Sequence, residues 1–205
     1  MFDNRKHIIS ALAAMTLISA PAWADVILPA PKTSAGMGVF AALNSRHSAK
    51  AGEFPLKDIS KQELSNLLWA ASGKNRFGKG WTVPFAMGKA PYNTIYVLDN
   101  SGVFKYNWKD NRLIEISKQD VREKAGPQPI VGLSPVVLVF VADSGTKPDV
   151  AWIASGAMTQ NIYLAAESLA IEGRYVISID EAQLRQALKL KPDEKPLNLM
   201  LIGKK

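Results

Sequence analysis

The chain contains no cysteine and only two histidines among its 205 residues. The absence of thiols excludes disulfide bridges, thiolate zinc sites, iron–sulfur clusters, a cysteine nucleophile and a lipoprotein anchor. Two histidines are too few for a histidine-rich metal site, so we expect no bound metal. With 47% hydrophobic and 21% charged residues, the composition favours a packed globular domain over a disordered chain.

Several familiar catalytic and nucleotide motifs are also missing. Gly78-Lys79-Gly80 lacks the spacing of a P-loop, and no G-x-G-x-x-G follows an expected strand, as a Rossmann dinucleotide site requires. Ser101-Gly102 and Ser155-Gly156 lack the pattern of a nucleophile elbow, and we expect His47 to lie far from any carboxylate partner. The sequence therefore does not support hydrolase chemistry.

The chain is basic but has no basic run. Twenty-five Lys and Arg against 18 Asp and Glu give a net charge of +7. The lysines are spread singly from Lys32 to Lys205 without interleaved aromatic residues, which argues against a nucleic-acid partner. A solvated basic surface with a site for a small anion is the better interpretation.

The first 24 residues have the three parts of a secretory signal peptide. A short basic region, 4–7, precedes a 13-residue apolar run, 8–20, and then Pro21 and the small-residue site Ala22-Trp23-Ala24. We expect cleavage after Ala24 and a periplasmic mature chain with a charge of +6 and no lasting membrane anchor. A retained anchor is the alternative, but the run is short of the roughly 20 residues that a spanning helix needs.

Residues 25–44 form a leader rich in proline and glycine, and its second half, 38–44, predicts a short helix. Ser60 and Glu63 then form a capping box, in which both side chains bond free backbone N–H groups at a helix start. An apolar face at i, i+3, i+4 and i+7 follows, and Gly73 ends that helix. Residues 78–91 predict a long irregular loop, a type that is often functional.

The rest of the chain predicts a hairpin and then alternating strands and helices. Strands are expected over 94–98, 103–106, 107–116, 136–142, 175–177 and 197–202, with helices over 150–172 and after Asp180. Val136–Ala142 is apolar without alternation, which is typical of a strand buried on both faces. This order predicts the α+β class, a mixed sheet with helices packed on it.

Residues 150–172 form the longest helical stretch, and Gly173 is expected to end it. Because apolar residues occupy nearly every face, the pattern predicts either a central buried helix or a seam between subunits. Gln160 and Asn161 interrupt the apolar residues and need hydrogen-bond partners if buried. We expect backbone or cross-subunit hydrogen bonds there, with ligand contact as the alternative.

One short segment has the composition of a phosphate site. Residues 45–50 bring together Arg46, His47, Ser48 and Lys50, and a guanidinium, an ammonium and a hydroxyl suit phosphate oxygens. The alternative is a solvated basic loop. Lys204 and Lys205 follow the last expected strand, and terminal lysines of this kind are normally a frayed tail.

Together these motifs resemble the nitroreductase family over roughly residues 40–205. The resemblance rests on Arg46–Lys50, on the helix ending Leu67–Gly73, on the loop from Pro84 to Pro91, and on the helix Gly156–Leu169. The sequence of Leu67–Arg76 looks most like that of the branch that contains the dehydrogenases of thiazole and oxazole peptide maturation.

The resemblance implies an FMN-dependent oxidoreductase, with 45–205 as the flavin domain of a homodimer and FMN at the subunit interface. Arg46, Ser48 and Lys50 would hold the phosphate and ribityl chain, and His47 would face the flavin. The flavin ring would lie against Pro84, Phe85, Ala86, Met87 and Gly88, with Ile177 and Ser178 near N5. Lys204 and Lys205 would approach the phosphate.

The chain departs from the family pattern in two places. The usual Pro-Ser motif reads Pro84-Phe85, which removes a hydroxyl contact, and the glycine-rich element before Asp180 reads Val176-Ile177-Ser178-Ile179. Our first hypothesis is a periplasmic oxidoreductase that takes electrons from a periplasmic donor and reduces a small nitroaromatic-like or quinone-like acceptor. The alternative is a periplasmic binding or partner module that kept the fold and lost flavin chemistry.

Overall fold

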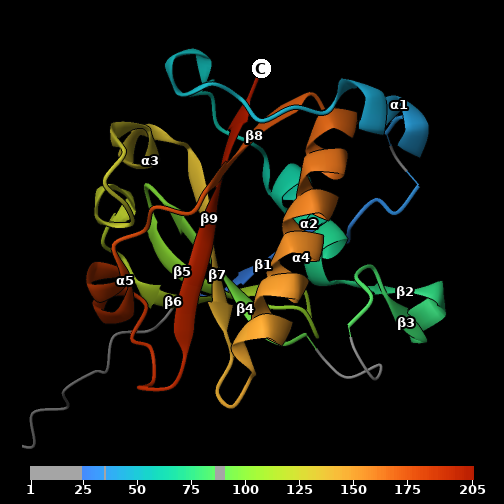
Figure 1. The fold of residues 1–205 in the computed structure, drawn as a ribbon. Coiled ribbons are helices and arrows are strands. Elements are labelled where there is room, and N and C mark those ends of the chain that lie inside the picture. The colour runs from blue at the N-terminus through green and yellow to red at the C-terminus, as the bar shows by residue number, and fades with distance from the viewer. Residues whose placement is uncertain (1–24, 35, 86–90) are drawn as a thin grey trace, which may run out of the picture.

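A seven-stranded sheet with helices on both faces forms the centre of the protein (Figure 1). The computed structural model describes residues 25–34, 36–85 and 91–205. The sheet order is β1-β6-β5-β4-β7-β9-β8, and β2 and β3 form a separate hairpin. The strands are β1 Val26–Ile27, β2 Lys74–Asn75, β3 Gly80–Trp81, β4 Asn93–Asp99, β5 Gly102–Asn107, β6 Arg112–Ser117, β7 Val136–Ala142, β8 Ile171–Val176 and β9 Lys195–Lys204. The helices are α1 Val39–Ser45, α2 Lys61–Ser72, α3 Pro129–Leu133, α4 Pro148–Ser168 and α5 Glu181–Ala187.

The predicted α+β class is confirmed, and neighbouring strands of the large sheet are antiparallel throughout the described pairs. The helical crossover α4 joins β7 to β8, which run in the same direction. They are not neighbours, because β9 lies between them and pairs antiparallel with both. The strand–helix–strand unit expected from the sequence is therefore present, with the last strand inserted into it.

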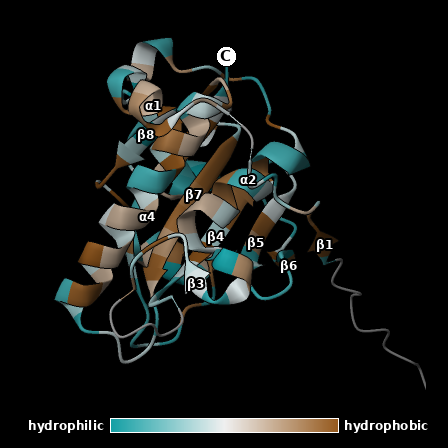
Figure 2. Ribbon diagram, turned by 90° about the vertical axis from the view of Figure 1, so that its right-hand side faces the viewer, coloured by the Kyte–Doolittle hydropathy of each residue, from teal (hydrophilic) through white to brown (hydrophobic). Residues whose placement is uncertain are grey.

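The central strand β7 is buried on both faces, as predicted. All seven of its residues are buried, and Figure 2 shows it as a hydrophobic ribbon among the helices. Leu138 and Phe140 share one core with residues of α2 and α4. Val137 and Val139 share the other core with residues of α3 and α5. The two cores follow from the alternation of side chains along a strand.

The helix starts follow the predicted caps. The Ser60 side chain accepts a bond from the N–H of Glu63, whose carboxylate accepts from the N–H of Ser60, which completes the capping box of α2. The Asp180 side chain accepts from the N–H of Gln183 and begins α5. Gly73 ends α2 as expected.

The predicted end of the long helix is wrong. α4 ends at Ser168, and Ala170 takes the left-handed conformation, with φ 54°, that usually falls to glycine. Gly173 lies inside β8 instead, where a Cβ would lie 2.5 Å from the end of the Met200 side chain. β8 therefore starts earlier than the predicted strand 175–177 and leaves Ile177 outside it.

The leader is bound to the rest of the domain. Val26 and Ile27 pair with β6, and Leu28 is buried in the core. The Ser65 hydroxyl of α2 donates to the carbonyl of Pro29 at 2.6 Å. The leader lacks a hydrophobic period because it uses single contacts to an open sheet edge and to one helix.

Part of α4 is left uncovered by the other residues that the structure describes. Trp152 is 42% exposed and Ile153 is 74% exposed. Asn161 is held inside, where its Nδ2 donates to the carbonyls of Ala70 and Thr82 at 3.0 Å each. This confirms the expected backbone hydrogen bonds for Asn161. Within the described ranges, none of the helices combines the length and the apolar character needed to cross a bilayer.

Candidate functional site

Residues 46–50 lie along the free edge of β8, the last strand in the sheet order. The N–H of Ala49 donates to the carbonyl of Gly173 at 3.0 Å, and Nη1 of Arg174 donates to the carbonyl of Ala49 at 2.7 Å. Ala49 is buried, whereas the residues on both sides of it are at least partly exposed. The sheet edge thus fixes this backbone and leaves its polar side chains accessible.

A buried carboxylate joins this segment to the end of β9. Glu172 is 8% exposed, and its Oε2 lies 3.3 Å from Nε2 of His47, while its Oε1 lies 2.8 Å from Nζ of Lys205. The hydrogen bond that Lys205 donates to Glu172 raises the pKa of Lys205. The expectation that His47 lies far from a carboxylate is wrong, because β8 brings Glu172 beside it.

Ser48 is oriented by two tyrosines. The backbone N–H of Tyr175 donates to Oη of Tyr163 at 2.8 Å, and that hydroxyl donates to Oγ of Ser48 at 2.9 Å. Oγ therefore acts as an acceptor in this contact, which leaves the Ser48 hydroxyl proton for another acceptor.

The other two cations of the segment are more loosely held. The guanidinium of Arg46 lies 5.2 Å from the centre of the Tyr163 ring, at cation–π distance. Nζ of Lys50 lies 3.4 Å from Oε1 of Glu53, and both of these side chains are more than 70% exposed. Exposed ion pairs of this kind are weak, so Lys50 can exchange its partner at little cost.

Lys204 points away from this group. Its Nζ lies 2.6 Å from Oε1 of Glu63 in the capping box of α2, and its N–H donates to the carbonyl of Lys57. Burial alone would raise the pKa of Glu63, but the bonds from Lys204 and Ser60 outweigh it and lower that pKa. Neither Lys204 nor Lys205 is a frayed tail. Only Lys205 joins the cations around Glu172.

Ile177 and Ser178 lie at the far end of β8 from this group. At about 3.3 Å per residue, Ile177 is about 16 Å from Glu172 along the strand. Ile177 is 65% exposed, and among the described residues no hydrogen-bond acceptor is found for the backbone N–H of Ile177 or of Ser178. The segment then turns back, and the N–H of Asp180 donates to the carbonyl of Ala125 at 3.0 Å.

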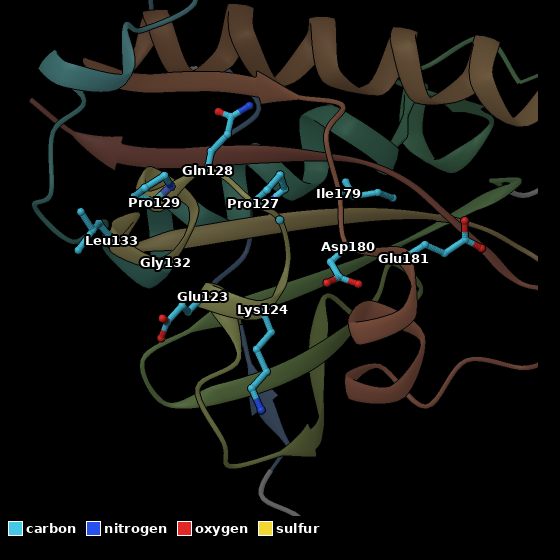
Figure 3. A pocket seen from close by; sticks show the side chains of 11 residues that line it. Glu123, Lys124, Pro127, Gln128, Pro129, Gly132, Leu133, Ile179, Asp180 and Glu181 are labelled. Carbon is cyan, nitrogen blue, oxygen red and sulfur yellow. The ribbon is translucent and has the colours of Figure 1, made fainter.

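A cavity of about 900 Å³ opens next to this turn. Figure 3 shows its two walls, one from residues 123–133 and the other from residues 179–181. Pro129 and Leu133 also line a smaller depression with Ala51 and Gly52, directly after Lys50. The surface is thus hollowed from the end of β8 back toward the basic segment.

Pro84 and Phe85 are placed on the other side of the core, after the hairpin β2–β3. Pro84 is exposed, whereas the Phe85 ring is 7% exposed and packs edge-on against Trp81 and Tyr92. Ala86, Met87 and Gly88 lie outside the described residues. The structure therefore does not bring Pro84 and Phe85 next to the basic segment within one chain.

The site contains residues that the sequence analysis did not single out. Glu172 was assigned to the end of a helix, where a carboxylate reads as solvated, and Tyr163 was read as part of an apolar helix face. A lone carboxylate within an otherwise apolar stretch was the one available signal for Glu172. Across the described part of the chain, no group of three or more His, Asp or Glu is arranged to hold a metal ion.

Comparisons with known proteins agree with this geometry. A Methanocaldococcus jannaschii protein described as a nitroreductase is 28% identical over 170 residues, which cover 75% of this chain and 85% of that protein. A crystal structure from Ralstonia eutropha JMP134, also described as a nitroreductase, is similar with a TM-score of 0.79 and 32% identity, and covers 88% of this chain and 89% of that one. Residues 43–204 match the nitroreductase family as a whole. The chain belongs to the nitroreductase family.

Proposed function

We propose that this member of an oxidoreductase family binds FMN and acts in the periplasm, where it passes electrons through flavin N5 to a small organic acceptor. The observation that carries the proposal is that His47 of the basic segment 46–50 and Lys205 meet at one buried carboxylate, Glu172. This contact brings Lys205 beside the basic segment, although the two are far apart in the sequence. An anionic ligand is the simplest reason for such an arrangement.

The residues at the basic end suit a phosphate. Arg46 offers a planar fork of donors, Lys205 a point charge, and Ser48 a hydroxyl proton that the tyrosine contact leaves free. Lys50 is exposed and can join them. In this proposal these four residues hold the phosphate and the ribityl chain.

The other end of β8 suits the flavin ring of FMN. Ile177 and Ser178 present N–H groups without an acceptor in the described residues, and the 900 Å³ cavity beside them has the volume of a ligand pocket. When bound, FMN supplies the redox chemistry, since N5 of its ring can accept and pass on two electrons. The backbone of Ile177–Ser178 would hold that edge of the ring in place. Pro84 and Phe85, from the second subunit of a homodimer, would lie against the ring.

The chain itself supplies position rather than acid–base chemistry. We assign no general acid or base to the titratable side chains near the two ends, because Glu172 is paired with His47 and Lys205, and Asp180 caps α5. The residues bind the ligand's anionic end and orient its ring edge, and the electron transfer belongs to the cofactor.

The signal-peptide pattern of residues 1–24, which lie outside the described residues, supports a periplasmic location. Free nicotinamide nucleotides are not normally supplied there, so the proposal includes a different periplasmic electron donor. Stopped-flow reduction with NADH and with NADPH tests this part. Fast reduction by either nucleotide, at a rate that matches turnover, would overturn it.

The main test is whether the purified mature protein binds FMN. We expect a yellow protein that releases a flavin on denaturation, and a protein whose free energy of unfolding rises by about 2.7 kcal/mol when free FMN is a hundredfold above its Kd. Melting curves with and without FMN measure this. A colourless protein whose melting does not respond to FMN would favour the binding-module alternative, which the buried Phe85 in place of the family's serine supports.

A further inference from the structure

The hairpin β2–β3 has three cations, Lys74, Arg76 and Lys79, and none of them has a carboxylate partner in the described structure. Nζ of Lys74 lies 3.8 Å from the centre of the Trp81 ring, at cation–π distance. Arg76 and Lys79 are exposed, and neither has an ion pair or a hydrogen bond from its side chain within the described parts of the chain. By contrast, the cations His47, Lys50, Lys204 and Lys205 all have carboxylate partners. The hairpin, residues 74–81, contains no acidic residue of its own.

The backbone holds the guanidinium of Arg76 over the hairpin. Arg76 and Phe77 both have left-handed φ angles, 46° and 55°, which are costly for residues with a side chain. This turn folds Arg76 back onto Gly80, where a Cβ would overlap the guanidinium. Gly80 is thus needed for the guanidinium to lie where it does.

A cavity of about 300 Å³ lies between this hairpin and the segment that follows it. Arg76 and Lys79 line one part, and Trp81, Pro84 and Phe85 line another. Trp81 is fixed by edge-on contacts to Phe85 and to Trp108, with ring centres 5.7 and 4.6 Å apart. The walls therefore combine positive charge with aromatic and proline surface.

The hairpin is anchored to the core at its base. The N–H of Thr82 donates to the carbonyl of Gly73 at 3.0 Å, and Nδ2 of Asn75 donates to the carbonyl of Trp81 at 2.8 Å. Asn161 of α4 also donates to the carbonyl of Thr82. The cavity is therefore held on a fixed frame, as a binding site requires.

We infer that this cavity is a subsite for the negatively charged end of the electron acceptor, and that the acceptor is a planar aromatic anion such as an arene carboxylate. The inference rests on the proposed function, because there Pro84 and Phe85 lie against the flavin ring and place the cavity beside it. Arg76 and Lys79 attract the anionic group. Lys74 lies over the Trp81 ring, so Pro84 and the part of Trp81 that lines the cavity offer the surface for an aromatic ring.

The test compares two probes of the same shape that differ in charge, 4-nitrobenzoate and 4-nitrobenzamide. Calorimetric titration of the oxidised holoprotein should give a Kd for the carboxylate at least about fivefold below that of the amide. The ratio of the two Kd values should fall as the salt concentration rises. Arg76→Ala and Lys79→Ala should each weaken binding of the carboxylate about threefold to tenfold and leave the amide unchanged.

Two further variants keep the test specific. Gly80→Ala retains every charge but displaces the guanidinium, so it should weaken the carboxylate and not the amide. Lys118→Ala removes an exposed lysine without an ion pair in the described structure and should change neither. Equal affinity of the wild type for both probes, or a preference that survives Arg76→Ala and Lys79→Ala, would overturn the inference.

The same measurement separates this inference from the proposed function. If the protein does not bind FMN, the proposed function fails, and titration of the flavin-free chain with the two probes still shows whether the cavity prefers the anion. If FMN binds but the probes are not distinguished, only the anion subsite fails.

Discussion

Glu172 is an unusual residue to find among the cations of the proposed phosphate site. A carboxylate that is 8% exposed needs partners, and His47 and Lys205 supply them. Its negative charge opposes binding of a second anion, but its Oε1 holds Lys205 in place and its Oε2 holds His47. Arg46 and Ser48 are therefore the hydrogen-bond donors of this group that have no carboxylate partner in the described structure.

Arg46 is therefore the side chain whose loss should affect FMN binding most. Arg46→Ala should weaken binding by about 1.5–3 kcal/mol, the usual contribution of a charge-assisted hydrogen bond, which is roughly a tenfold to more than a hundredfold rise in Kd. Titration of apoprotein with FMN, followed by flavin fluorescence, measures this. Lys118→Ala is the control and should leave Kd unchanged. Unchanged affinity in Arg46→Ala would remove this residue from the site.

At the scale of elements, the start of α2 and the end of β9 are tied by one ion pair. The carboxylate of Glu63 accepts hydrogen bonds from the backbone N–H and the hydroxyl of Ser60, and it forms an ion pair with Nζ of Lys204. The pair fixes the last strand residue before Lys205 and thereby places Lys205 near Glu172. The ion pair between Lys204 and Glu63 thus helps to place Lys205 at the proposed phosphate site, although neither Lys204 nor Glu63 lies in that site.

The lowered pKa of Glu63 sets the pH dependence of its ion pair with Lys204. A carboxylate whose folded pKa lies below its unfolded value stabilises the fold above the unfolded pKa, and loses that contribution as pH falls through the folded pKa. Glu63→Gln should lower the free energy of unfolding by about 1–2 kcal/mol at pH 7. The difference from wild type should shrink below about pH 4.5.

Urea denaturation at pH 7 and at pH 3 measures the effect. Glu123→Gln makes the same change of charge at an exposed residue and should have little effect at either pH. A difference between wild type and Glu63→Gln that is the same at both pH values would mean that the ion pair with Lys204 does not stabilise the fold.

At the scale of the whole molecule, the exposed apolar face of α4 predicts a homodimer. Ile153 on α4 is 74% exposed, and Trp152 beside it is 42% exposed. Apolar side chains this exposed mark an association surface when they gather on packed elements. A second subunit is also what the proposed site needs to bring Pro84 and Phe85 to the flavin ring.

Light scattering at micromolar concentration should give the mass of a dimer for the mature chain. Ile153→Glu should raise the dimer Kd about 10- to 100-fold, since it places a charge in an apolar contact. Ile27→Glu, at an isoleucine that is 71% exposed on β1, is the matched control and should leave the dimer intact. A monomeric wild type would contradict the prediction.

Elements whose signals are local could be predicted from the sequence. The capping box of α2, the apolar strand β7 and the Asp180 cap are confirmed, because each depends on residues within a few positions of one another. The basic segment 46–50 was also visible, since its chemistry is written in consecutive residues. The α+β class followed from the order of these elements.

The residues that come together at the proposed site depend on long-range strand pairing. Glu172 meets His47 and Lys205 because β8 lies between the basic segment 46–50 and β9, an arrangement that no local pattern encodes. The end of α4 was misplaced because Ala170 took a conformation that sequence reasoning gives to glycine. Long-range strand pairing overrode local preference there, because the hydrogen bonds and burial of β8 outweigh the small cost of one left-handed alanine.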